Sequence, residues 1–166
     1  MSLNANLIKE LREKSGAGMV DCKNALLQND NNVEKSIDWL RKKGLSVAAK
    51  KSGRVAAEGL VGVNIINNQA CLIEINSETD FVSRNEQFQK FVSDCSKIAV
   101  TTNGDLKNLL KSKFINSDNT VEDELTKNVA TIGENLNIRR IEKINLDEPG
   151  IIVSYVHNSV SENLGK

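Results

Sequence analysis

Apolar residues recur at helical spacing three times within the first 44 residues, and polar turns separate the three repeats. The first repeat follows Asn4, a good helix cap, and ends at the glycine-containing stretch 15–18. The third repeat is capped by Asn31 or Asn32, and Gly44 is predicted to stop it. The apolar positions of the three repeats are Leu7, Ile8 and Leu11; Met19, Val20, Cys22, Ala25, Leu26 and Leu27; and Val33, Ile37, Trp39 and Leu40. The pattern predicts a compact bundle of three short helices.

The pattern then changes to the alternation of apolar and polar residues that is typical of β-strands. Residues 58–66 and 69–75 flank Asn67 and Asn68, and asparagine tolerates the positive φ of a tight hairpin turn. Two antiparallel strands are therefore predicted here. Two further β-rich stretches are predicted as a third and a fourth strand, 137–144 and 151–157. No partner strand is predicted for residues 159–166.

Amphipathic stretches between these strands predict three further helices, 88–100, 105–113 and one that begins at Thr120 and ends at 132–135. Thr120 is followed three positions later by Asp123, the spacing of a capping box. The predicted fold class is α+β, in which a three-helix module precedes a core with a small antiparallel sheet packed against helices. The change of pattern puts the boundary between residues 1–54 and residues 55–166.

An acid and an aromatic residue stand side by side where the second strand gives way to a helix. Asp80 and Phe81 follow the strand 69–75 and precede the helix 88–100, and these two elements can pack together and hold the corner between them. The ring of Phe81 is then either part of the core or a group presented to a partner.

Composition describes an ordinary globular protein, with 39% hydrophobic and 27% charged residues among 166. No apolar run approaches the roughly 18 residues that cross a bilayer. The start of the chain has neither an apolar signal core nor an Arg-rich transit pattern, so a cytoplasmic protein without membrane contact is expected. The net charge of zero hides an asymmetry. Residues 1–54 carry eleven Lys and Arg against six Asp and Glu, and residues 55–166 carry eleven against sixteen.

Part of this positive charge gathers in one basic cluster around residue 47. Its members are Arg41, Lys42, Lys43, Lys50, Lys51 and Arg54. The cluster lacks interleaved aromatic residues, and Glu34 and Asp38 lie close to it in the sequence. A solvated face or a protein-binding surface is therefore favoured over RNA binding, and nothing in the sequence would read DNA bases.

Candidate chemistry is sparse. Cys22, Cys71 and Cys95 are widely separated in apolar surroundings, which favours buried free thiols over disulfides or a zinc site. His157 is the single histidine, and no local motif supports a nucleophilic pair with Cys22. The sequence therefore predicts no enzyme activity, no metal site and no cofactor of its own.

Three motifs, taken in order, resemble the elongation factor Ts family, the nucleotide-exchange partners of elongation factor Tu in bacteria and organelles. The first motif comprises Leu7-Ile8-Lys9-Glu10-Leu11-Arg12, Gly16-Ala17-Gly18-Met19 and Asp21-Cys22-Lys23-Asn24-Ala25-Leu26; the second is Glu78-Thr79-Asp80-Phe81-Val82; and the third is Ile132-Gly133-Glu134-Asn135-Leu136-Asn137-Ile138-Arg139-Arg140. The resemblance covers nearly the whole chain, from the first helix to His157.

The resemblance implies a helical module similar to ubiquitin-associated domains, an α+β core or dimerisation domain, and guanine-nucleotide exchange on elongation factor Tu without bond-changing chemistry. Asp80 and Phe81 match the pair that the family carries toward the magnesium and phosphate region of the partner's GTPase domain, so the chain would act on magnesium and GDP held by the partner. The N-terminal contacts with that domain match Arg12, Met19 and Lys23. Further core contacts match Ile132, Gly133 and His157.

The chain departs from the family pattern in three places. Val20 replaces what is often a second methionine and keeps an apolar contact with the partner. The turn after His157 lacks the usual glycine. The family pattern continues beyond Lys166, so a fragment that contains the N-terminal half of the core is expected, and a homodimer is possible. Phe81 should be substantially exposed without the partner, and a buried ring would count against this interpretation.

Overall fold

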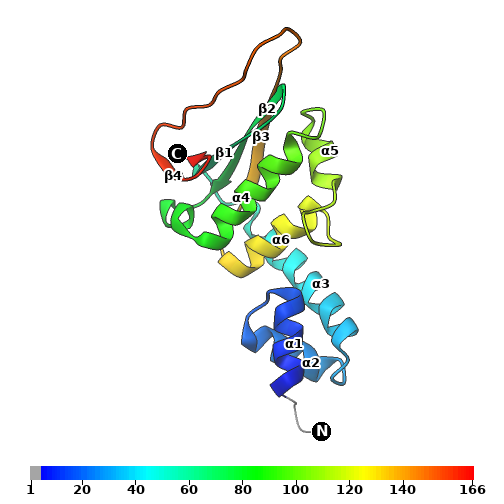
Figure 1. Cartoon of the computed structure of the whole chain (residues 1–166). Coiled ribbons are helices and arrows are strands. Elements are labelled where there is room, and N and C mark those ends of the chain that lie inside the picture. Colours follow the sequence, from blue (N-terminus) through cyan, green and yellow to red (C-terminus); the bar gives the residue numbers. More distant parts are fainter. Residues whose placement is uncertain (1–4) are drawn as a thin grey trace.

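The computed structural model describes residues 5–166, so the predicted cap Asn4 lies outside the described part. Figure 1 shows a helical end connected by α3 to a core in which helices cover one face of a sheet. The helices are α1 (Ala5–Ser15), α2 (Met19–Gln28), α3 (Val33–Lys51), α4 (Glu86–Ala99), α5 (Leu106–Lys111) and α6 (Val121–Ile132), with a 3₁₀ helix η1 (Asp80–Arg84). The strands are β1 (Glu58–Ile66), β2 (Gln69–Ser77), β3 (Asn137–Asn145), β4 (Ser159–Ser161) and β5 (Leu164–Gly165). The predicted α+β class is confirmed.

The three N-terminal helices enclose a small core of their own. Its fully buried members are Leu11, Cys22, Ala25 and Leu26. Asn32 caps α3, since its side-chain oxygen accepts a hydrogen bond from the Lys35 amide at 2.9 Å. The three predicted helices are therefore present, whereas the likeness to ubiquitin-associated domains stays a prediction.

The predicted stop at Gly44 is wrong, because α3 continues through this residue to Lys51. Gly44 is buried where α3 packs against α6, and a Cβ atom there would lie 3.8 Å from the side chains of Thr126 and Ala130. A glycine inside a helix costs only about 1 kcal/mol, and the packing against α6 offsets that cost. The result is one continuous helix that joins the helical module to the core.

The sheet has the order β3-β2-β1-β5-β4, and all of its pairings are antiparallel. Asn67 takes a positive φ of 52° in the turn between β1 and β2, as predicted. The inner face of the sheet packs against α4. The fully buried side chains between the sheet and the helix include Ile73 and Ile75 of β2 and Phe88 and Val92 of α4. This sheet and helix fix the corner between β2 and α4.

The predicted fourth strand is wrong. Residues 151–156 run without a strand partner, and Ile151, Val153 and Tyr155 are more than three-quarters exposed. In Figure 1 this part of the chain loops away from the sheet before it returns at β4. The chain after Asn158 forms the last two strands instead, and β5 pairs with β1, so the expectation that this segment lacks a partner is also wrong.

Turn chemistry explains these last two strands. Asn158 and Asn163 both take positive φ, which asparagine tolerates better than other residues with a side chain. Gly165 allows the close approach of the returning chain, because a Cβ there would meet the Val156 side chain at 2.4 Å. Alternation alone predicts a strand at 151–157, and only these turns show where the pairing occurs.

The capping box of α6 supports a stability prediction. The Thr120 hydroxyl accepts from the Asp123 amide at 3.2 Å, and the Asp123 carboxylate accepts from the Thr120 amide at 3.1 Å. We expect Thr120→Ala to lower the free energy of unfolding by about 1 kcal/mol, measured by urea denaturation. Thr131→Ala is the control, since its hydroxyl only donates to the Lys127 carbonyl within the same helix. Equal losses in the two variants would contradict a specific capping role.

Candidate functional site

The corner after β2 presents an aromatic ring on a buried base. Phe81 is 75% exposed, whereas its neighbours Val82 and Ser83 are 6% and 0% exposed. The short helix η1 turns the chain so that the backbone around Phe81 is anchored while the ring points away from the core. The expected exposure of the ring is therefore found.

Asp80 offers a free carboxylate beside this ring. Within residues 5–166 its side chain makes no hydrogen bond or ion pair, although its backbone carbonyl accepts from the Ser83 hydroxyl at 2.6 Å. The acid and the ring are thus both available to a second molecule, and the backbone that carries them is held in place.

The turn between α6 and β3 lies directly against this corner. Gly133 ends α6 with a φ of 87°, which confirms the predicted helix stop, and Ile132 is partly buried against the main core. The next residue, Glu134, accepts a hydrogen bond from the Thr79 amide at 3.0 Å. The structure therefore connects the turn that follows the predicted positions 132–133 to Thr79, the residue before Asp80 and Phe81.

The sequence did not single out Glu134. It belongs to the third family motif, but an acidic side chain at such a position is also common on solvated surfaces. A local rule does not point to Glu134, because the backbone groups that lack partners at the C-terminal end of a helix are carbonyls, which a carboxylate cannot satisfy.

The helical module carries a second group of predicted contact residues. Arg12 lies in the last turn of α1, Met19 and Val20 lie in the first turn of α2, and Lys23 follows one turn later; all four are exposed. Met19 is 61% and Val20 is 69% exposed. Two adjacent apolar side chains on the surface, flanked by cations, suit contact with another protein.

His157 lies apart from these elements in the turn before β4. Its side chain is exposed, and its Nδ1 atom lies 3.3 Å from the hydroxyl oxygen of Tyr155. Cys22 is buried inside the helical module, so the structure does not join these two residues in a nucleophilic pair.

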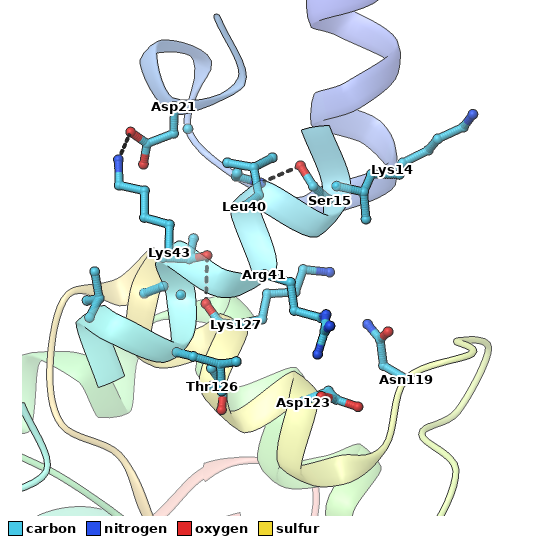
Figure 2. A pocket seen from close by; sticks show the side chains of 18 residues that line it. Lys14, Ser15, Asp21, Leu40, Arg41, Lys43, Asn119, Asp123, Thr126 and Lys127 are labelled. Atoms are coloured by element: carbon cyan, nitrogen blue, oxygen red, sulfur yellow. Dashed lines mark hydrogen bonds and ion pairs between the residues drawn. The ribbon is translucent and has the colours of Figure 1, made fainter. Parts of the chain in front are cut away.

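A groove of about 200 Å³ separates the helical module from α6. Figure 2 shows Arg41 of α3 reaching across it toward Asn119 and Asp123. The rest of the lining is mixed, with the small residues Ala17 and Gly18 on the module side and lysines around them. The groove therefore contains no set of groups arranged for catalysis.

Three of the six side chains in the basic cluster make contacts with other residues of the chain. Lys43 pairs with Asp21 at 2.6 Å, Arg54 lies 3.5 Å from the Glu78 carboxylate, and Lys51 donates to the Gly133 carbonyl. Cations committed to such contacts are less available to neutralise phosphates, which weakens the case for RNA binding by this surface.

The thiols of Cys71 and Cys95 are poor nucleophiles. Burial, together with the negative charges of Asp94 and Glu124, holds the pKa of Cys95 well above its ordinary value. Burial raises the pKa of Cys71 to about 11, despite the opposing charge of Lys143.

In residues 5–166 no group of three or more His, Cys, Asp or Glu side chains could hold a metal ion. Every helix in that part of the chain is too short or too polar to span a membrane.

Comparison with known proteins gives a consistent result. The sequence profile of the family described as elongation factor TS matches residues 78–165. Elongation factor Ts of Methylobacterium radiotolerans is 52% identical over 165 residues, which are 99% of this chain and 53% of that protein. The proteins of the same name from Rhodospirillum centenum and Xanthobacter autotrophicus are 52% and 50% identical, also over 53% of their lengths. The chain spans about half the length of these curated relatives.

Proposed function

The chain belongs to the elongation factor Ts family, and we propose that it acts in translation elongation as a guanine-nucleotide exchange factor. It binds elongation factor Tu in the GDP form and promotes release of GDP in the cytoplasm. The observation that carries the proposal is the exposed Phe81 ring, which stands on a buried base beside the Asp80 carboxylate, a group that has no partner among residues 5–166.

The corner acts by binding and changes no covalent bond. Phe81 inserts between elements of the partner, and Asp80 disturbs the hydrogen bonds and water around the magnesium ion that the partner holds with GDP. The chain therefore binds nucleotide-free elongation factor Tu better than the GDP complex. By linkage, it weakens GDP binding by the same factor by which GDP weakens its own binding.

The remaining contact positions orient the two proteins. Met19 and Val20 supply an apolar contact from the helical module, and Arg12 and Lys23 supply charge beside it. Ile132, Gly133 and His157 contact the partner from the core. Two attachment points on one rigid body raise the effective concentration of the second point once the first has bound.

The direct test is release of labelled GDP from elongation factor Tu in the presence of this chain. We expect faster release, and at saturation a GDP affinity that is weaker by roughly 5- to 150-fold, the usual range of such coupling. A matching loss of affinity between the chain and the partner when GDP is added would verify the reciprocity. Release at the intrinsic rate would show that residues 1–166 are not an exchange factor by themselves.

A further inference from the structure

Two carboxylates connect residues 78–85, the Phe81 corner, with residues 133–136, the α6–β3 turn. One carboxylate reaches from the turn to the corner, and the other reaches from the corner to the turn. The Glu134 carboxylate accepts from the Thr79 hydroxyl at 2.6 Å and from the Thr79 amide at 3.0 Å. In return, the Glu78 carboxylate accepts from the Asn135 amide at 2.6 Å. These hydrogen bonds join segments more than 50 positions apart, and bonds to charged acceptors are the strong class.

The geometry of Thr79 shows that the connection is long-range and not local. Thr79 occupies the N-cap position of η1, where a threonine hydroxyl usually accepts from an amide of its own helix. Here the hydroxyl makes no such bond and donates to Glu134 instead. The amide and the hydroxyl of one residue are both bound to one carboxylate, which fixes the orientation of the backbone just before Asp80.

The end of α3 joins the same cluster. The Arg54 guanidinium lies 3.5 Å from the Glu78 carboxylate, and the Arg54 carbonyl accepts from the Asn135 side-chain amide at 2.8 Å. The Lys51 ammonium donates to the Gly133 carbonyl. The carboxylates of Glu78 and Glu134 and the cations of Lys51 and Arg54 thus gather in one cluster. The Glu78 side chain is only 20% exposed.

We propose that Glu134 and Glu78 are positioning residues that hold the Phe81 corner at a fixed place relative to Ile132, Gly133 and α3. This role rests on the proposed function, because it concerns how the corner and the helical module reach one partner together. The ring stays exposed without the connection, but the backbone that carries it moves between several positions. An anchor must enter its pocket in one orientation, so such movement lowers the rate of nucleotide release.

The test compares Glu134→Ala with Glu142→Ala, a control that removes an exposed carboxylate of β3 with no hydrogen bond or ion pair among residues 5–166. Amide hydrogen exchange should become about tenfold faster or more at Thr79 in Glu134→Ala and stay unchanged in the control. At saturating concentrations of the Glu134→Ala chain, GDP release from elongation factor Tu should be several-fold slower than with wild type. The chain concentration that gives half of the maximal release rate should change less. Glu134→Gln keeps one acceptor oxygen, so its release rate should lie between those of wild type and Glu134→Ala.

A second variant keeps the test independent of folding defects. Thr79→Val removes only the hydroxyl donor, and its effect on GDP release should be non-additive with that of Glu134→Ala. Unchanged exchange at Thr79 in Glu134→Ala, or additive effects in the double variant, would overturn the positioning role. If the wild-type chain does not accelerate GDP release, the proposed function fails, while amide exchange at Thr79 still decides whether Glu134 holds the corner.

Discussion

Replacing Phe81 with alanine is expected to slow factor-stimulated GDP release by about 30-fold, which corresponds to the roughly 2 kcal/mol that one buried anchor contributes to binding. The ring is 75% exposed in the free chain, so it gains its buried surroundings only in the complex. The free energy of unfolding should therefore change by no more than about 0.5 kcal/mol. Stopped-flow release of labelled GDP and urea denaturation measure the two quantities.

Ile144→Ala is the control for this variant, since Ile144 is a large apolar residue of β3 that is 49% exposed and not among the proposed contacts. With Ile144→Ala, GDP release from elongation factor Tu should proceed at the rate seen with the wild-type chain. Equal acceleration by wild type and Phe81→Ala would remove the role of the ring as an anchor and leave Asp80 and the helical module as the remaining candidates.

Phe88→Ala should have the opposite outcome, a large loss of stability. Phe88 lies seven positions after Phe81, in the first turn of α4, and it is 0% exposed. Truncation leaves a cavity between α4 and the sheet, because neighbouring side chains relax only partly, and the expected loss is about 3–5 kcal/mol of the free energy of unfolding. The urea midpoint should fall at an unchanged m-value.

The pair of phenylalanines makes this prediction demanding. The same substitution, made twice in one short segment, should separate function from stability. A loss of less than about 1 kcal/mol in Phe88→Ala would contradict the packing of α4 against the sheet. A large drop in the free energy of unfolding of Phe81→Ala would show that the ring belongs to the core. It would also count against the proposed function.

Much of the local structure could be predicted because its causes lie within a few residues. The capping box of Thr120 and Asp123 follows from side chains that reach their own backbone, and the turn at Asn67 follows from tolerance of positive φ. Helical periodicity likewise located the helices around Leu11 and Phe88. These signals do not depend on how distant elements pack.

The failures all involve contacts between distant parts of the chain. Gly44 is helical because α6 packs against it, which a local helix-stop rule cannot include. The stretch 151–156 alternates like a strand but has no neighbour to pair with, whereas β5 finds an open edge of β1. A strand exists only as part of a sheet, so alternation alone cannot show which segment is paired.

For the candidate site, the sequence by itself determined the chemistry: an acid and a ring at a strand-to-helix corner, within motifs that identify the family. The tertiary structure alone decided that the Phe81 ring is exposed and that Glu134 and Glu78 hold its base against the α6–β3 turn. The physical reason is that exposure and long-range hydrogen bonds depend on which surfaces remain uncovered after packing. Residue order specifies a side chain, whereas the folded chain specifies its surroundings.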